Sequence, residues 1–280
     1  MQIARAIAKR VLSPSLTHHL ADAVGTAMLS QVPRQQLHTS ALRKADTIDI
    51  SAVFRDEQIG RAWDEDFARV FSHWKGSGPG SVNRGDCRAI YYLVAALKPN
   101  NVIEIGTNLA GSSVFIAAAQ RSHCGPYSKL TTVDIIDVNT PSGPWARTKM
   151  EKPPAACIGD VGLADRVEFV VQPALDFLAS AKEADLIFLD GSHAHNDVYR
   201  ELSRATKALA KDGVILLHDY YPAGRPLFEG SRALKGPYRA VERYRSEGAP
   251  VRVMPFGELP WPTRKHENRN FSSLALFLAE

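Results

Sequence analysis

The chain has 280 residues, of which 45% are hydrophobic, so it can bury a full-sized core as one large domain, with or without an extension. It contains no run of eighteen apolar residues, so we expect no membrane-spanning helix. The net charge of +4 comes from the first 44 residues, which carry +5 against −1 for the remaining 236. Because a nucleic-acid-binding domain carries its basic face on the folded body, we expect no nucleic-acid partner.

The three cysteines (Cys87, Cys124 and Cys157) are widely spaced and form no CxxC pair, which argues against a disulfide framework and a structural zinc site. We therefore expect a reducing compartment and a cytoplasmic protein. The first residues, MQIARAIAKRVL, place Ile3 and Ile7 at helical spacing among basic residues. This pattern is typical of an amphipathic helix packed on the protein body. A mitochondrial transit peptide has the same pattern, so that alternative stays open.

Helix-like segments fill residues 1–75, where they are interrupted by Pro14 and Pro33 and followed by the glycine-rich turn KGSGPGS. We interpret residues 1–80 as an N-terminal helical extension and residues 81–280 as the main domain. The oligomeric state is left open, with a homodimer among the alternatives.

From Gly85 onward, short apolar runs alternate with helical segments. The predicted strands are 101–105, 129–136, 167–171, 185–190, 213–219, 251–256 and 273–278. The predicted helices are 87–97, 112–121, part of 158–165, 173–182 and 196–211. Strands that alternate with helices and are apolar throughout indicate a parallel sheet covered on both faces. We therefore predict the α/β class, with a doubly wound, Rossmann-like, mostly parallel seven-stranded sheet whose last strand is antiparallel.

Polar residues follow the predicted strands at the edge where an open parallel sheet binds its ligands. They are Glu104 with Gly106, then Asp134, then Asp190 with His193, and finally His218 with Asp219. We expect these side chains to meet in one site.

The turn after the first strand reads EIGTNLAGSS, which has glycines before a helix but is not GxGxxG. It begins with a carboxylate, which disfavours a pyrophosphate. Asp134 lies 23 residues after Gly111, the distance at which an acid can accept hydrogen bonds from ribose hydroxyls. A ligand with a ribose and a cationic end suits both features, and a nicotinamide cofactor is the weaker alternative.

At this point the sequence resembles a known family. The segments VIEIGTNLAGSS, LTTVDI, ADRVEFV, DLIFLDGSH and KDGVILLHDY, in this order, are similar to the class I S-adenosylmethionine-dependent methyltransferases. More narrowly, they resemble the branch with catechol O-methyltransferase-like and macrocin-type O-methyltransferases. The resemblance covers about residues 82–220 and leaves residues 1–75 outside.

The resemblance implies a binding site for S-adenosylmethionine. Glu104 and Gly106 would hold its methionine end, and the loop after them would line it. Asp134 would take the ribose, Gln172 would border the adenine, and Asp190 would lie near the sulfonium. The implied loop residues are Thr107, Asn108, Gly111 and Ser112. The family usually has glycine where Ala110 stands, so the loop contacts are open to change.

The resemblance also implies a divalent metal held by Asp190, His218 and Asp219. Oxygen ligands suit Mg²⁺, whereas a histidine in the set makes manganese, iron or zinc acceptable. The alternative is a site without metal, in which the two carboxylates balance the charge of the sulfonium.

His193 stands where the catechol-type enzymes place the lysine that deprotonates the acceptor hydroxyl, so the resemblance implies a general base at His193, with Asp190 beside it in the catalytic turn. A hydrogen-bonded loop histidine is the simpler alternative. His195 completes HAHND, which is similar to a metallo-β-lactamase-type signature, but Val198 stands where that signature has a further histidine. We therefore expect His195 at the solvated start of the helix at 196–211, with Asn196 or Asp197 capping it.

The segment 220–238 is rich in proline, glycine and aromatic residues, and a loop of this kind beside an active site is typical of a lid or an acceptor wall. Trp145 and Trp261 are further candidates for an aromatic acceptor pocket, although each could equally pack in the core. The sequence thus predicts an enzyme that O-methylates a hydroxyl of a small molecule, sugar or natural product. The alternatives are a nicotinamide-dependent oxidoreductase and a non-catalytic cofactor-binding module.

Overall fold

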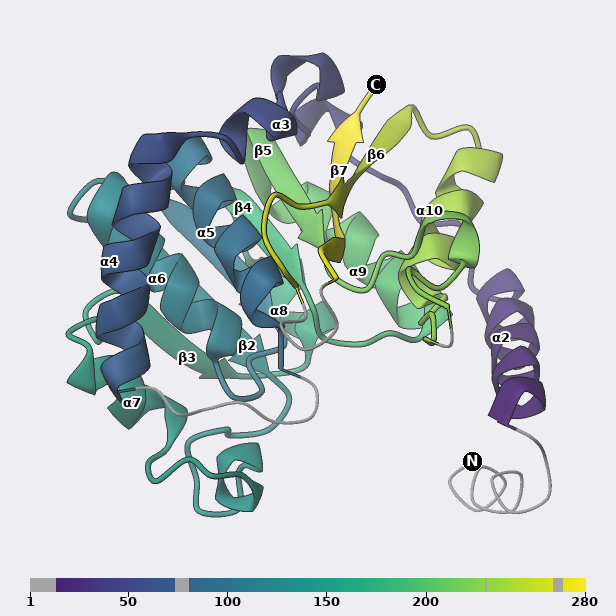
Figure 1. Ribbon diagram of the computed structural model, residues 1–280. Coiled ribbons are helices and arrows are strands. Elements are labelled where there is room, and N and C mark those ends of the chain that lie inside the picture. Colours follow the sequence, from purple (N-terminus) through teal and green to yellow (C-terminus); the bar gives the residue numbers. More distant parts are fainter. Residues whose placement is uncertain (1–13, 74–80, 230, 264–268) are drawn as a thin grey trace.

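The computed structural model describes residues 14–73, 81–229, 231–263 and 269–280. Its centre is a seven-stranded sheet in the order β3-β2-β1-β4-β5-β7-β6 (Figure 1). The strands are β1 (Asn101–Ile105), β2 (Lys129–Asp134), β3 (Val167–Val171), β4 (Ala184–Leu189), β5 (Leu209–Leu217), β6 (Val251–Glu258) and β7 (Phe271–Ala279). β7 is antiparallel to both of its neighbours, whereas the first five strands pair in parallel. The predicted fold class is confirmed.

Helices cover both faces of the sheet (Figure 1). On one face lie α4 (Glu57–His73), α5 (Arg84–Leu97), α6 (Gly111–His123) and α7 (Pro154–Asp160), and on the other lie α8 (Ala174–Ser180), α9 (His195–Ala208) and α10 (Gly236–Ser246). Successive residues of a strand point to opposite faces. In β4, Leu186 and Phe188 enter the first core, and Ile187 and Leu189 enter the second. This explains why the strand is apolar throughout.

The N-terminal segment packs against both faces of the main domain. α2 (Pro14–Ser30) lies against α9 and α10, while α3 (Ile50–Val53) and α4 lie against α5. Between them, Leu42 pairs with Gly213 of β5. The division at residue 80 stays a prediction, and the amphipathic segment at residues 1–13 lies outside the described residues.

The largest departure from the predicted elements is α10, which begins where a loop was expected. Gly236 and Pro237 indicate a turn in the sequence, but proline in the first turn of a helix loses no hydrogen bond and has the required φ. β5 also begins at Leu209 rather than at residue 213, so α9 ends three residues early.

Because β7 runs against the parallel strands, its first residues lie at the edge of the sheet where β4 and β5 end. Leu217 of β5 pairs with Ala275, and Tyr220 donates its backbone N–H to Ser273. In the described part of the chain, no helix combines the length and the apolar character that a membrane crossing requires.

Candidate active site

A cavity of about 1280 Å³ opens at the carboxyl ends of β1, β2, β4 and β5. Residues after these strands form its floor, the start of α5 forms one side, and residues from the segment 220–238, here called the wall segment, form another. Its lining is strongly acidic. The acids are Asp86, Asp134, Asp176, Asp190, Asp197, Glu201 and Asp219.

Gly106 is the turn residue at which the chain leaves β1. Its φ of +99° lies in a region that L side chains rarely adopt. A Cβ at this position would also overlap the backbone carbonyl of Asp190, so the turns after β1 and β4 lie against each other. Asp190 closes the contact by donating its backbone N–H to the carbonyl of Ile105, at 2.9 Å.

The loop after Gly106 explains the departure from the family pattern. Ala110 has a φ of +56°, so it occupies the left-handed conformation that glycine adopts without strain. Gly111 has no such φ, and no atom lies within 4 Å of a Cβ built there. Ala110 thus adopts the conformation in which a glycine would be unstrained, and Gly111 does not.

Glu104 is not among the residues that line the cavity, and its role at the methionine end of a cofactor stays a prediction. Its carboxylate is fully buried on the α6 side of the sheet. It accepts hydrogen bonds from the hydroxyls of Ser112 (2.5 Å), Ser113 and Thr132 (2.6 Å). Burial raises the pKa of Glu104 to about 7, against the hydrogen bonds, which lower it. Thr107, Gly111 and Ser112 likewise do not line the cavity.

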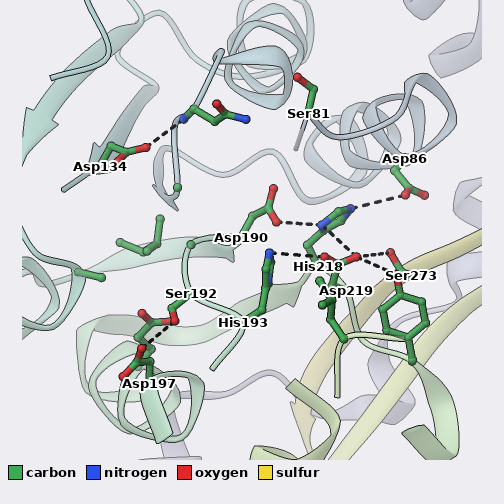
Figure 2. A pocket seen from close by; sticks show the side chains of 18 of the residues that line it. Ser81, Asp86, Asp134, Asp190, Ser192, His193, Asp197, His218, Asp219 and Ser273 are labelled. Carbon is green, nitrogen blue, oxygen red and sulfur yellow. Dashed lines mark hydrogen bonds and ion pairs between the residues drawn. The ribbon is translucent and has the colours of Figure 1, made fainter. Parts of the chain in front are cut away.

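The other predicted cofactor residues do line the cavity: Gly106, Asn108, Asp134, Gln172 and Asp190. Asp134 also fixes the loop, because its Oδ2 accepts the backbone N–H groups of Thr107 (3.1 Å) and Asn108 (3.0 Å) (Figure 2). The cavity thus has a preorganised end, formed by the turns after β1, β2 and β3.

At the other end, Asp190, His193 and Asp219 converge. Each offers a ligand atom within 4.8 Å of the others, and they are the metal-ligand group found among the described residues. Nε2 of His193 lies 3.5 Å from Oδ2 of Asp219. Tyr221 and Ser273 hold Asp219 by donating hydrogen bonds to its Oδ1, at 3.1 and 3.4 Å.

His218 lies between Asp190 and Asp86, and its Nδ1 is also 3.7 Å from Oδ1 of Asp219 (Figure 2). Its Nδ1 is 2.8 Å from Oδ1 of Asp190, an ion pair without hydrogen-bond alignment, and its Nε2 is 3.7 Å from Oδ2 of Asp86. Burial lowers the pKa of His218, but the carboxylates, above all Asp190, raise it well above its usual range. The prediction that His218 is a metal ligand stays a prediction, and His193 is a further candidate ligand beside Asp190 and Asp219.

Residues 103–220, which contain all four of these strand ends, match the family model described as a methyltransferase domain. Catechol O-methyltransferase of Mycobacterium tuberculosis is 28% identical over 143 residues, which are 50% of this chain and 57% of that protein. The match thus spans little more than half of the relative's length.

Residues 103–220 are thus similar to a methyltransferase domain. The O-methyltransferase TomG of Streptomyces achromogenes, solved with SAM, has a TM-score of 0.53 at 17% identity, over 92% of this chain and 96% of that one. The O-methyltransferase of Bacillus cereus, solved with SAH, has a TM-score of 0.53 at 16% identity, over 81% and 92%. At these identities the structures show the shared fold, and the resemblance expected from the sequence is confirmed.

The cavity lining contains functional candidates that the sequence did not reveal. Asp86, in the first turn of α5, is buried and accepts hydrogen bonds from Ser272 (2.6 Å) and Asn83 (2.5 Å). An acid in a first turn normally interacts with the helix dipole, so the sequence gave no sign that Asp86 faces His218.

Glu201, in the second turn of α9, is a further candidate that lines the cavity. Glu201 is only 3% exposed. Burial, together with the charge of Asp197, raises the pKa of Glu201 to about 8. Asp197 itself accepts a hydrogen bond from Ser192, at 2.7 Å (Figure 2). The sequence analysis did not single out Glu201, and only the fold shows that it lines the cavity.

His195 begins α9, as expected, but it is 8% exposed and not solvated. Its Nε2 lies 3.0 Å from Oδ1 of Asp22 on α2, and it does not line the cavity. Ala194 is the N-cap, with no side-chain cap, so the predicted capping by Asn196 or Asp197 is wrong. This geometry removes the basis for a hydrolase-type metal site at HAHND.

Neither tryptophan proposed for the acceptor pocket lines the cavity. Trp261 is buried against Tyr92 and donates its Nε1–H to the carbonyl of Gly85, at 2.9 Å. Trp145 donates to the carbonyl of Thr140, at 2.8 Å. The aromatic lining comes instead from Tyr221 and Phe228 of the wall segment and from Phe271 of β7.

Proposed function

We propose that the chain is an S-adenosylmethionine-dependent O-methyltransferase that acts on a hydroxyl group of a small molecule, sugar or natural product. The observation that carries this proposal is the convergence of Asp190, His193 and Asp219 in an acid-lined cavity directly beside the Gly106 turn. A cofactor with a sulfonium, an ammonium and a ribose suits carboxylates that accept hydrogen bonds and balance positive charge. The relatives solved with SAM or SAH support the same cofactor.

In this proposal, one end of the cavity binds the cofactor and the other binds the methyl acceptor. The cofactor end consists of Gly106, Asn108, Asp134 and Gln172, with Asp190 at its border. The acceptor end consists of His193 and Asp219 with the apolar residues Leu227, Phe228, Leu234 and Phe271. These apolar residues favour an acceptor with an aromatic or aliphatic body next to its hydroxyl.

His193 is proposed to accept the proton of the acceptor hydroxyl at Nε2. Asp219, 3.5 Å away, stabilises the imidazolium that results. S-adenosylmethionine supplies the methyl group, whose bond to sulfur breaks as the acceptor oxygen bonds to its carbon. The protein otherwise contributes by holding the two ligands in line and excluding water.

A divalent cation is a second arrangement that the same residues could support. Asp190, His193 and Asp219 would hold it, and it would lower the pKa of the acceptor hydroxyl. His193 would then be a ligand and not the base. The mixed set of two carboxylates and one imidazole suits Mn²⁺, Fe²⁺ or Zn²⁺ as well as Mg²⁺.

Calorimetric titration with S-adenosylhomocysteine tests the proposal. We expect a dissociation constant in the micromolar range, and no binding at high micromolar concentration would contradict the proposal. A parallel titration with NADH should show no binding, and the reverse result would restore the oxidoreductase alternative. Methyl transfer from S-adenosylmethionine to a panel that includes catechol, with and without EDTA, decides between the base and the metal arrangements.

A further inference from the structure

α2 belongs to the N-terminal segment, outside the residues that match the methyltransferase model, yet it carries a carboxylate that contacts both sides of the acceptor end. Asp22 is mostly buried, with 13% of its side chain exposed. Its partners come from two different elements, α9 and the start of α10. They are Nε2 of His195 (3.0 Å), Nζ of Lys235 (2.9 Å), and Nη2 and Nε of Arg239 (3.0 and 3.3 Å).

The first partner, His195, belongs to the turn that carries the reactive residues. It lies two residues after His193 and five after Asp190. The ring of His195 rests on Gly25, where a Cβ would clash with the imidazole. α2 therefore holds this ring by the side-chain contact with Asp22 and by close packing at Gly25.

The other two partners, Lys235 and Arg239, lie at the end of the wall segment and in the first turn of α10. Gly236 between them lies directly against the backbone carbonyl of His193, which a Cβ would overlap. The wall segment and the His193 turn are thus packed on each other. Asp22 bridges them from outside the cavity.

We propose that Asp22 is a positioning residue whose carboxylate fixes the His193 turn and the wall segment to each other, so that the acceptor end keeps its shape. Burial alone would raise the pKa of Asp22, but its cationic partners lower it below the usual range, so the carboxylate stays charged. Removal of the charge leaves Lys235 and Arg239 close together without a counterion, so the wall segment loses its attachment to α2.

Hydrogen exchange of the full-length chain tests this without any assumption about the reaction. In Asp22→Asn we expect amides of residues 191–199 and 231–245 to exchange at least about fivefold faster, and those of residues 101–118 to stay unchanged. Asp46→Asn, at an exposed site in the same N-terminal segment, is the matched control and should change neither region. Unchanged exchange in both regions, or equal acceleration in residues 101–118, would overturn the proposal.

A second variant covers the case in which Asp22→Asn does not fold. Arg239→Gln removes two of the contacts but leaves the contact between Asp22 and His195, so faster exchange should be confined to residues 231–245. No acceleration in that region overturns the proposal.

A kinetic test of the Asp22 proposal rests on the proposed function. With catechol as the probe acceptor, Asp22→Asn should raise the KM for the acceptor by about tenfold while the KM for S-adenosylmethionine stays within about twofold, and Asp22→Glu should restore part of the loss. An equal loss for both ligands would indicate a merely structural role. S-adenosylhomocysteine binding, which Asp22 should not affect, keeps a failure of this proposal distinct from a failure of the proposed function.

Discussion

At the cofactor end of the cavity, the turns after neighbouring strands hold one another directly, whereas at the acceptor end a side chain from the N-terminal segment adds to the packing of Gly236 on His193. Gly106 packs on the carbonyl of Asp190, and Asp134 binds the N–H groups of the loop after β1. The wall segment instead depends on Asp22, which is 213 residues before Lys235. The comparison teaches that the shape of the proposed cofactor end follows from adjacent strand ends of the sheet, while the shape of the proposed acceptor end also depends on the docking of α2.

The largest expected effect is at the cofactor end. Gly106→Ala combines a φ of +99° with an overlap at the Asp190 carbonyl. We expect a loss of about 3 kcal/mol or more in the free energy of unfolding and a weakening of S-adenosylhomocysteine binding by about a hundredfold. Urea denaturation and calorimetry measure the two effects. Gly111→Ala, with a free Cβ site and an ordinary φ, is the control, and a similar loss in both variants would contradict the argument.

The second effect separates the two ends. His193→Gln should lower kcat by about a hundredfold or more, because it removes the proposed proton acceptor, while the dissociation constant of S-adenosylhomocysteine stays within about twofold. Rapid-quench assays of methyl transfer measure kcat, and calorimetry measures the dissociation constant of S-adenosylhomocysteine. Equal losses in catalysis and cofactor binding would show that the ends are not independent.

The third effect concerns Glu201, the buried acid on α9. The pKa of Glu201 is raised to about 8, so its neutral form is favoured in the fold, and the free energy of unfolding should fall as pH rises from about 4.5, the unfolded value, to about 8. Glu201→Gln removes this dependence and should be more stable than the wild type at pH 9 by about 1–3 kcal/mol.

Urea denaturation at pH 5, 7 and 9 measures the effect of Glu201→Gln. Glu104, whose pKa is raised to about 7, remains in both proteins and retains part of the slope below that pH. Parallel stability curves for wild type and variant would contradict the assignment.

The smallest effect is expected at Ala110. Ala110→Gly relieves the left-handed conformation at a φ of +56° but adds freedom to the unfolded chain and removes a buried methyl group. These contributions oppose each other, so we expect a change within about 1 kcal/mol, measured by thermal unfolding, and unchanged cofactor binding. A loss of binding would mean that Ala110 contacts the ligand.

The sequence predicted the sheet well because strand periodicity and polar strand ends are local features. β1 and β3 have the predicted bounds, and Asp134 and Asp190 lie in the cavity as expected. The face of the sheet to which each strand side chain points was harder to predict than the strands themselves. Glu104 and Ile105 are neighbours on one strand, and a shift of one residue decides which face each occupies.

Contacts away from the strand ends were not predictable. Nothing near Asp22 or Asp86 in the sequence indicates that they face Lys235 and His218, because these partners come from other elements. α10 was missed for a different reason, since its Gly-Pro start is also typical of a loop.

The reversed direction of β7 has a practical consequence. The strand begins at Phe271 and Ser273 in the cavity and ends at the opposite edge of the sheet, where Ala279 donates its N–H to the carbonyl of Arg43. A fluorophore or surface tether attached at Glu280 would therefore sit far from the bound ligands. Immobilised protein oriented in this way would present its cavity to the solution, which suits screening for the unknown acceptor.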